Sequence, residues 1–550
     1  MTASLDLFTS FMGRSLARIL SADSQEPALE VIAHTFPSAE ANTGSSPAFV
    51  WSLADAVSPA YAAALRFAPP DHQTIEADVA AFAAMVGELA RDRPAVFVAS
   101  LVDRRHARGY GMLDLAPGTG LSYRLMEMNL QLAKALAAFP NVFLLNAELW
   151  LRMTGPLACQ PKQWFVAKIP FHQSVFQAAA SDVKAGLRAL RGSRRKIIIT
   201  DLDDTLWGGI LGEVGWRDLR LGGHDHVGEM HRELQDVLKA WSRYGVQLAV
   251  VSKNDEADAL AAFENHPDML LRTTDLAGWR INWNNKADNI RSLLDELRLG
   301  LDSAVFLDDN PVERHLVRQC LPQVFVPELP EDRTLWPGVV AGLNVFDQPS
   351  VSREDRARTA MYVAERTRAA SRGEGASVED WVASLGIVVS PARLGGADLA
   401  RAVQLLNKTN QMNLSTRRLT AEELMAWLQG PRRHLWTYRV ADRFGDSGLT
   451  GIASLDLGDG HARLIDFVMS CRVIGRRIED AILAHVIAQS QALGAAGFQA
   501  VLHPTERNTV CTEFFRRKSG LTEEEGNRFV WPMAETYPHP ASVTLLPLPA

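Results

Sequence analysis

Four clusters of polar side chains between residues 197 and 310 combine the groups that phosphoryl transfer needs. Three of them directly follow short apolar runs, and the fourth lies in the polar stretch NWNNKADNI. Together they offer a nucleophile, an acid/base group, a cation and hydrogen-bond donors for phosphoryl oxygens. The clusters are Asp201 to Thr205, Ser252 to Asn254, Lys286, and Asp308 to Asn310.

The charges of these clusters predict a metal and a division of roles. Asp201 and Asp203 would repel Asp308 and Asp309 unless a divalent cation lay between them, and ligands that are all oxygens favour Mg²⁺. We therefore predict all four carboxylates as metal ligands. Asp201 would attack phosphorus to form an aspartyl phosphate. Asp203 would act as general acid to the leaving group and then as general base to water.

The other polar side chains are predicted to bind the phosphate. Lys286 would offset charge on the phosphoryl oxygens and on the nucleophile, and the Ser252 hydroxyl would donate to one of these oxygens. Further predicted contacts are Thr205, Lys253 and Asn254. A lone D-x-D-x-T pattern is weak, but three apolar runs that each end in a polar cluster disfavour the alternative of merely solvated loop acids.

The elements that position these clusters are the apolar runs at 197–199, 246–251 and 304–307, with helical stretches between them. This alternation predicts a doubly wound parallel sheet, whose ligand site lies at the carboxyl ends of its strands. The interval from Asp203 to Ser252 spans 252 − 203 = 49 positions, and that from Ser252 to Lys286 spans 34. Neither holds a separate cap domain, so we expect an open, capless site.

The segment KIIITDLDDTLWGG resembles motif one of the haloacid-dehalogenase (HAD) superfamily, and Ser252, Lys286 and Asp308-Asp309 match its second, third and fourth motifs. DLDDTLWGGILGEVG, VVSKND and FLDDNPVER resemble the FkbH-like subfamily in particular. That subfamily usually has Asn in motif one where this chain has Asp204. The resemblance implies a Rossmann-like HAD phosphatase domain.

Residues 1–190 are predicted to form an α/β domain. The expected strands are 29–34, 49–53, 95–101 and 142–145, and the expected crossover helix is 121–139. Through RGYGMLDLAPGTG the domain resembles the SGNH-hydrolase-like amino-terminal part of the same family. The segment HTFPSAE stands where a Gly-Asp-Ser would follow the first strand, and no Asp-x-x-His motif lies near the domain's end. We expect a scaffold or carrier-docking role without catalysis.

The last part of the chain is predicted to be an α+β domain with strands at 386–390, 435–440, 448–455 and 462–469. LLNKTNQMNLSTRR offers Asn410 and Arg417 as substrate ligands, or else forms a capped turn. The turn after Met469, which contains Arg472, could present backbone N–H groups to a phosphate. It is similar to the loop of the GNAT acyltransferase fold, although Arg477 replaces the expected small residue. These segments also resemble the carboxy-terminal part of FkbH-like proteins.

Four scattered cysteines allow a thioester but indicate neither a disulfide framework nor a zinc site. Cys471 is the preferred acylated thiol because nearby cations at Arg472, Arg476 and Arg477 would lower its pKa. The alternative is a buried inert thiol. Cys511 is less favoured, and Cys159 and Cys320 are less favoured again; His461 and His503 are candidate bases by sequence proximity alone.

The composition excludes several classes of partner. Lys+Arg number 57 and Asp+Glu number 64, which gives 57 − 64 = −7 and no basic field for nucleic acid or anionic membranes. No apolar run approaches the ~18 residues of a membrane span, and Asp6 precedes any basic residue. We therefore expect a soluble cytoplasmic protein without nucleic-acid or membrane partners.

The predicted domains are an SGNH-like domain at 1–190, an HAD-like domain at 191–345, a charged helical linker at 346–378 and a GNAT-like domain at 379–550. The resemblance implies that the chain takes the glyceryl unit of 1,3-bisphosphoglycerate and removes phosphate. It would then load the unit as a thioester on the phosphopantetheine arm of an acyl carrier protein for polyketide-type biosynthesis. The alternatives are transfer of another acyl group, a stand-alone Mg²⁺ phosphatase with an inert binding domain, and an adaptor with vestigial sites.

Overall fold

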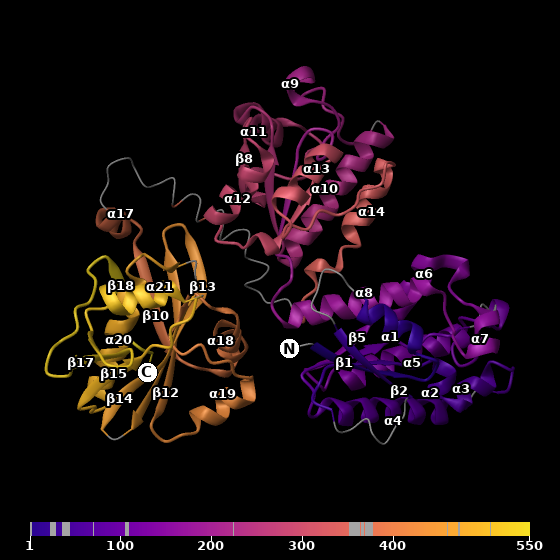
Figure 1. The fold of residues 1–550 in the computed structure, drawn as a ribbon, viewed down its shortest axis with the longest axis horizontal. Helices are drawn as coiled ribbons and strands as arrows, with labels where there is room; N and C mark the ends of the chain where they lie inside the picture. Colours follow the sequence, from indigo (N-terminus) through magenta and orange to yellow (C-terminus); the bar gives the residue numbers. More distant parts are fainter. Residues whose placement is uncertain are drawn as a thin grey trace. The chain divides into compact units, whose positions relative to one another are not determined.

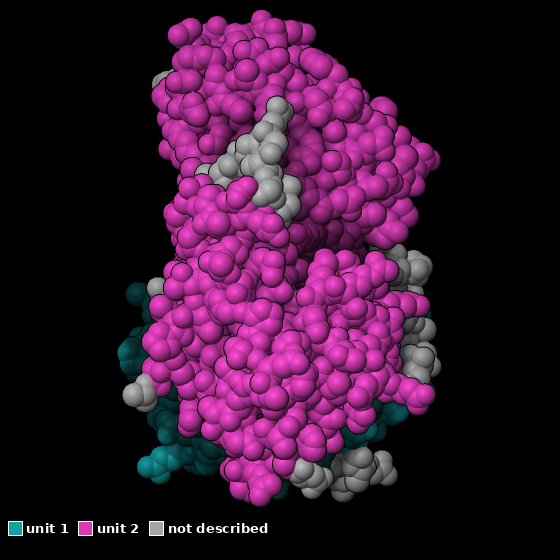
Figure 2. Space-filling model, turned by 90° about the vertical axis from the view of Figure 1, so that its left-hand side faces the viewer, with its two compact units in different colours: residues 1–194, 343–350 teal, residues 195–342, 351–550 magenta. Residues whose placement is uncertain are grey.

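The computed structural model describes residues 3–22, 29–35, 44–69, 71–104, 109–223, 225–350, 364, 368, 378–458, 460–470, 473–506 and 508–549. Their strands form three separate sheets, so the chain is a multidomain α/β protein with parallel sheets, as predicted. Figure 2 colours its two compact units, residues 1–194 with 343–350 and residues 195–342 with 351–550. Apart from 364 and 368, the core of the predicted helical linker at 351–377 lies outside the described residues. The predicted domain boundaries stay a prediction.

Figure 1 shows the ribbon of the chain, coloured along the sequence. The first sheet has five parallel strands in the order β2-β1-β3-β4-β5. The sequence analysis missed β1, because Ser4 and Asp6 interrupt its apolar run. Asp6 is nevertheless buried, and Nη1 of Arg93 donates to its carboxylate at 2.6 Å. The strands are β1 (Ala3–Thr9), β2 (Leu29–Thr35), β3 (Ala48–Trp51), β4 (Val96–Ala99) and β5 (Val142–Leu145).

The helices of the first unit pack against both faces of this sheet, since side chains of the same strands belong to two hydrophobic clusters. Phe49 lies in the cluster with Phe176 of α8, whereas Val50 lies in the cluster with Val79 of α4. The helices are α1 (Arg14–Ser21), α2 (Ala54–Val57), α3 (Pro59–Ala64), α4 (His72–Ala90), α5 (Leu121–Leu136), α6 (Ala147–Thr154), α7 (Pro161–Ala167) and α8 (Gln173–Leu190).

The second sheet has four parallel strands in the order β8-β7-β6-β9, so the strand order reverses between β6 and β9. Open sheets of this kind bind ligands at such a switch point, beyond the carboxyl ends of the strands. The sequence analysis missed β8, whose Gly278 and Arg280 break the apolar pattern. The strands are β6 (Ile197–Thr200), β7 (Gln247–Ser252), β8 (Leu276–Ile281) and β9 (Ala304–Leu307).

The helices around the second sheet leave no room for an inserted domain. Between Asp203 and Ser252 the described residues form a turn, α9, α10 and β7, and between Ser252 and Lys286 they form α11, a 3₁₀ turn and β8. These intervals thus contain no cap within the described part. The helices are α9 (Leu211–Val214), α10 (His226–Tyr244), α11 (Glu256–Asn265), α12 (Lys286–Glu296), α13 (Pro311–Cys320) and α14 (Trp336–Ala341).

The third sheet is mixed, with the strand order β16-β17-β15-β14-β13-β12-β10-β18, and β11 pairs with β14 beside this path. The predicted strands β10, β12, β13 and β14 are present, with longer bounds. The strands are β10 (Ile387–Arg393), β11 (Met412–Asn413), β12 (Arg433–Asp442), β13 (Gly445–Gly458), β14 (His461–Met469), β15 (Gly497–Val501), β16 (Thr522–Glu524), β17 (Arg528–Pro532) and β18 (Val543–Leu545).

Strands β14 and β15 diverge, and the chain itself fills the gap between them. Their parallel pairing runs from His461 to Leu464 of β14, whereas β11 pairs with Val468 and Met469. The backbone N–H of His503 donates to the carbonyl of Leu414, just after β11, at 3.0 Å. The helices of this domain are α17 (Val378–Ser384), α18 (Gly396–Lys408), α19 (Ala421–Leu428), α20 (Ile478–Ala492) and α21 (Thr509–Glu513).

Among the described residues, we find no helix with the length and hydropathy that crossing a membrane requires.

Candidate active site

The pairing of β6 with β9 brings two of the predicted carboxylates together. Thr200 lies opposite Leu307 in the parallel register, so the residues that follow, Asp201 and Asp308, emerge at the same level. The backbone N–H of Asp201 donates to the carbonyl of Leu307 at 2.9 Å and fixes this geometry. All four residues of each strand are buried, which makes the sheet a rigid base for the two acids.

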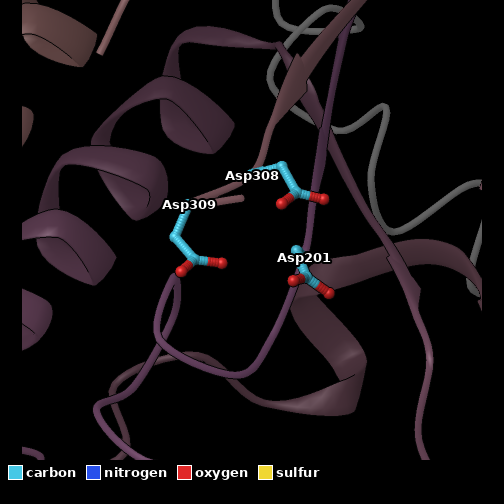
Figure 3. A group of neighbouring side chains, drawn as sticks. All are labelled: Asp201, Asp308 and Asp309. Carbon is cyan, nitrogen blue, oxygen red and sulfur yellow. The ribbon is translucent and has the colours of Figure 1, made fainter. Parts of the chain in front are cut away.

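Carboxylate oxygens of Asp201, Asp308 and Asp309 lie within 4.8 Å of one another (Figure 3). Asp201 and Asp308 are 6% and 0% exposed, so their charges are poorly hydrated. The Oδ1 atom of Asp201 is buried without a hydrogen-bond partner among the described residues. A buried, unpartnered oxygen beside two further carboxylates fits a bound divalent cation, and the all-oxygen donor set fits Mg²⁺.

Lys286 sits between two of the acids. Its Nζ lies 2.7 Å from Oδ2 of Asp308 and 2.9 Å from Oδ2 of Asp201, and the residue is 4% exposed. Burial acts to lower the pKa of Lys286, but the two carboxylates outweigh it, and the net pKa is raised. The ammonium group therefore stays charged at neutral pH. It is the first residue of α12, behind the Asn285 side chain that caps the helix.

The acids of this site are harder to ionise than free carboxyls. Burial and the charge of Asp201 raise the pKa of Asp308 to about 7, although Lys286 acts to lower it. Burial, followed by the same neighbouring charge, also raises the pKa of Asp309. These shifts arise because like charges lie close together in a buried, poorly hydrated site. A bound cation would reduce the repulsion between them.

Asp203, the predicted fourth metal ligand, lies outside the carboxylate group. Its Oδ1 accepts from the Trp207 indole N–H at 2.9 Å and from the Leu211 N–H at 3.2 Å, and its Oδ2 accepts from Asn254 at 2.9 Å. The structure thus brings three of the four predicted metal ligands together, and metal binding by Asp203 stays a prediction. Burial raises the pKa of Asp203, which keeps more of it protonated and suits the predicted general acid.

The turn after Asp203 explains why Asp can stand where the resembling subfamily usually has Asn. Asp204 has φ 53°, in the left-handed region, and its Oδ1 accepts from the Gly209 N–H at 3.0 Å. Asn and Asp are the non-glycine residues that adopt this conformation most readily.

Three predicted phosphate ligands have other partners. Thr205 is fully buried, and its hydroxyl accepts from the backbone N–H of Asp309 at 2.9 Å, so it positions an acid. Asn254 holds Asp203, as described. Lys253 pairs with Glu313 at 2.7 Å and remains 41% exposed. Ser252, 1% exposed, ends β7 and keeps its predicted place at the carboxyl end of the sheet.

Arg333 is a site residue that the sequence analysis missed. Its guanidinium donates to Oδ2 of Asp309 at 3.1 Å and to the carbonyl of Asp204 at 3.2 Å. It lies in a 3₁₀ turn (Arg333–Leu335), outside the four polar clusters of the sequence analysis. No spacing rule links it to the acids, so only the fold reveals it.

Replacing Arg333 by Ala is expected to lower phosphate release about tenfold, because Asp309 and the turn at Asp204 lose a shared anchor. Arg333→Lys should restore little of the lost rate, since an ammonium group lacks the planar guanidinium geometry that donates to both partners at once. Steady-state phosphate release measures this. Arg318→Ala is the control, because that guanidinium donates to the carbonyls of Val326 and Pro327 instead. A wild-type rate for the Arg333→Ala protein would contradict the role.

In the third domain, the predicted substrate ligands Asn410 and Arg417 have hydrogen-bond partners within the chain. Both guanidinium arms of Arg417 donate to the buried Asp466, and the amide oxygen of Asn410 accepts from Arg418 at 2.6 Å. The hydroxyls of Ser415 and Ser454 also donate to Asp466. These contacts agree with the internally bonded alternative for residues 409–418, and substrate binding by Asn410 and Arg417 stays a prediction.

The turn after β14 does not offer all its donors to a phosphate. The backbone N–H of Gly475 donates to the carboxylate of Glu479, which is 6% exposed. A side chain of the chain itself, whose pKa burial raises, therefore occupies this position of the predicted phosphate loop. Cys471 and Arg472, both predicted site residues, lie outside the described residues.

Burial makes two of the three described cysteines poor nucleophiles. Burial raises the pKa of Cys511 to about 12 and that of Cys159 to about 11. Cys320 is exposed at the end of α13. Since a thiolate is the reactive form, none of the three displaces Cys471 as the preferred thiol.

The first domain also needs a correction. Its first strand is β1, not the strand that precedes HTFPSAE, and the residue after it is Ser10. The Ser10 hydroxyl accepts from the backbone N–H of Leu53 at 3.0 Å. No hydrogen bond within the described part of the chain joins Ser10 to a histidine, so the described residues do not pair this hydroxyl with a general base.

No protein-family model matches the chain, and no curated protein matches it. Among solved structures, it is similar to the N-terminal part of the protein BF1531 from Bacteroides fragilis, which contains a phosphatase domain and was crystallised with Mg. The identity is 26% and the TM-score 0.57, over 64% of this chain and 95% of that one. This match confirms the prediction of an enzyme with a phosphatase domain, and its Mg agrees with the predicted metal.

Two acetyltransferases match a smaller share. Spermidine N-acetyltransferase from Vibrio cholerae, in complex with CoA and spermine, is 14% identical over 27% of this chain and 97% of its own, with a TM-score of 0.22. The aminoglycoside acetyltransferase AAC(6')-Ib, in complex with coenzyme A, is 14% identical over 26% and 95%, with a TM-score of 0.21. Likenesses at these TM-scores carry no conclusion about the third domain.

Proposed function

We propose that the chain is a Mg²⁺-dependent phosphatase of the HAD type that acts in the cytoplasm. The observation that carries the proposal is the group of Asp201, Asp308 and Asp309 at the switch point of the second sheet, with Lys286 between two of them. These three carboxylates would hold the metal, which would shield the charge of the substrate's phosphate.

The residues of the chain then have separate tasks. A carboxylate oxygen of Asp201 attacks phosphorus, and the bond from phosphorus to the leaving oxygen breaks as Asp203 donates a proton to that oxygen. Asp203 next removes a proton from water, which attacks the aspartyl phosphate and releases inorganic phosphate. Lys286 stabilises the negative charge of the phosphoryl oxygens throughout.

We further propose that the substrate is a phosphoglyceryl unit from 1,3-bisphosphoglycerate and that the chain delivers the glyceryl group to the phosphopantetheine thiol of an acyl carrier protein, for polyketide-type biosynthesis. An SGNH-like first domain and a GNAT-like third domain belong to this proposal. The FkbH-like motifs of the sequence support it. Intact-mass analysis after incubation with 1,3-bisphosphoglycerate and a panel of holo-carrier proteins tests it, and failure to load any carrier would refute it.

A second candidate is a stand-alone phosphatase whose third domain does not transfer an acyl group. It is favoured by the carboxylate of Glu479 in the turn after β14 and by the engagement of Arg417 with Asp466. Under this candidate, the same incubation would release phosphate without acylating any protein.

Cys471→Ala separates the two candidates on the enzyme itself. If Cys471 carries the acyl group, the variant should lose the enzyme-bound adduct completely and keep its phosphatase activity on a small phosphomonoester. Hydroxylamine-sensitive mass shifts measure the adduct. Cys320→Ala, which removes an exposed thiol, is the matched control. A full yield of adduct in Cys471→Ala would place the thioester on another residue.

Metal binding should depend on pH. Because the pKa of Asp308 lies near 7 rather than 3.8, this group favours folding below about pH 4, and that contribution is lost as the pH rises through 7. Mg²⁺ competes with the same proton, so we expect its Kd to fall about tenfold from pH 6 to pH 8. Titration calorimetry at both pH values measures this, and Asp308→Asn should remove most of the difference. An equal Kd at both pH values would contradict the assignment.

A further inference from the structure

The first unit exposes a group of large apolar side chains along α6, α7 and the turn between them. These helices follow β5, so they lie beyond the carboxyl end of the first sheet (Figure 1). We call this group the α6–α7 surface. Its members and their exposed fractions are Met153 (71%), Leu157 (68%), Phe165 (76%) and Val166 (80%).

Further exposed apolar side chains lie on segments that leave the same end of the sheet after β3 and β4. The two regions are linked, because the guanidinium carbon of Arg104, after β4, lies 4.0 Å from the ring centroid of Trp164 in α7. The additional side chains are Phe67, Met112, Leu113 and Leu115, with exposed fractions from 56% to 100%. Single exposed apolar residues need no explanation, but eight at one end of a sheet are typical of an interaction site.

The charges around the α6–α7 surface are mostly positive. From 146 to 173 the chain has three cations, Arg152, Lys162 and Lys168, and one acid, Glu148, whereas the whole chain has a net charge of −7. All four side chains are exposed. Within the described part of the chain, neither Arg152 nor Lys162 forms an ion pair. The segment 146–173 therefore combines apolar contact area with a net positive charge.

We propose that the α6–α7 surface binds a protein partner whose own surface is acidic around exposed apolar side chains. This inference rests on the proposed function, under which that partner is the carrier protein and the first domain is its docking platform. Apolar contact would supply the buried area, and the three cations would orient the partner by charge complementarity.

Other occupants are disfavoured by the same features. A second copy of the chain related by a twofold axis would place the cations of one surface against those of the other. A membrane is disfavoured because α7, with seven residues, is short for a helix that lies in a bilayer interface. Both occupants are outcomes of the experiment below.

Two double variants of the full chain test the surface: Phe165→Ser with Val166→Ser, and Arg152→Glu with Lys162→Glu. The matched control is Met126→Ser with Leu130→Ser, two side chains on α5 that are 54% and 57% exposed. The probes are fluorescently labelled holo-carrier proteins, measured by anisotropy. We expect at least a tenfold higher Kd for either surface variant, less than a twofold change for the control, and unchanged phosphate release from p-nitrophenyl phosphate.

An unchanged Kd in both surface variants, with carrier loading intact, would overturn the docking surface and leave the proposed function standing. If the wild-type chain loads no carrier protein, the proposed function fails, and the docking partner fails with it. Loss of co-sedimentation with phosphatidylserine vesicles in the surface variants would assign the surface to a membrane. A dimer that the same variants dissociate would assign it to a second copy, and either result overturns the proposal.

Discussion

Asp201→Asn is expected to lower phosphate release by about a thousandfold or more while the protein remains folded. An amide cannot attack phosphorus, so the covalent route is closed. The substitution keeps the shape of the side chain and removes one of three negative charges in a buried group, so it should not lower the melting temperature. Phosphate release and a thermal melt of the same preparation measure the two quantities.

The control for this variant lies three residues away. Asp204→Asn makes the same chemical change at a position where the side-chain oxygen accepts from the Gly209 N–H, as an amide oxygen can, and where only a half-exposed ion pair with Arg333 at 3.4 Å is lost. Its activity should stay within about threefold of wild type. Undiminished turnover by folded Asp201→Asn protein would remove Asp201 as the nucleophile.

The sequence predicted the second domain well because its strands are short apolar runs buried on both sides. Such runs mark parallel strands, and each polar cluster follows a strand end. The bounds of β9 agree with the prediction, and the register between β6 and β9 then brings Asp201 and Asp308 together without further information. Order along the chain was enough to place this part of the site.

The sequence could not show where side chains find their partners. Asp203 follows the same strand as Asp201, yet its carboxylate accepts from an indole N–H and an amide and lies outside the group of Asp201, Asp308 and Asp309. Arg333 reaches Asp309 only because the fold returns a distant turn to the site. In the third domain, amides and guanidinium groups that looked like ligands proved to be internal partners, since a buried acid such as Asp466 must be compensated.

Polar positions inside strands caused the missed elements. β1 contains a buried Asp6 that is paired with Arg93, and β8 contains Gly278 and Arg280, so neither has the apolar pattern of a central strand. Missing β1 had a consequence for function, because the expected position of a nucleophile was then placed after β2 instead of after β1. The hydroxyl that follows the true first strand belongs to Ser10.

The intervals on either side of β7 are too short for a cap domain, and this affects which substrate the site can hold. The described residues between Asp203 and Lys286 form turns, helices and strands of the phosphatase sheet itself, with no inserted domain. Cap domains or lids enclose small substrates and exclude water from the site. Without a cap, this site has less surface with which to hold a free three-carbon phosphate.

A phosphoglyceryl group tethered to a protein should therefore lose its phosphate faster than free 3-phosphoglycerate. Tethering raises the effective concentration of the group at the site, to the millimolar range for a short flexible arm, and it needs an opening that a cap would close. When both substrates are supplied at 10 micromolar and the enzyme is in sufficient excess to bind the carrier, we expect release from the phosphoglyceryl-carrier protein to be about a hundredfold faster. This is the ratio of about 1 millimolar effective concentration to 10 micromolar free acid. Rapid-quench measurement of phosphate compares the two substrates, and an unphosphorylated glyceryl-carrier added to the free acid controls for activation by the carrier alone. Equal or faster release from the free acid would show that the site recognises the small molecule by itself.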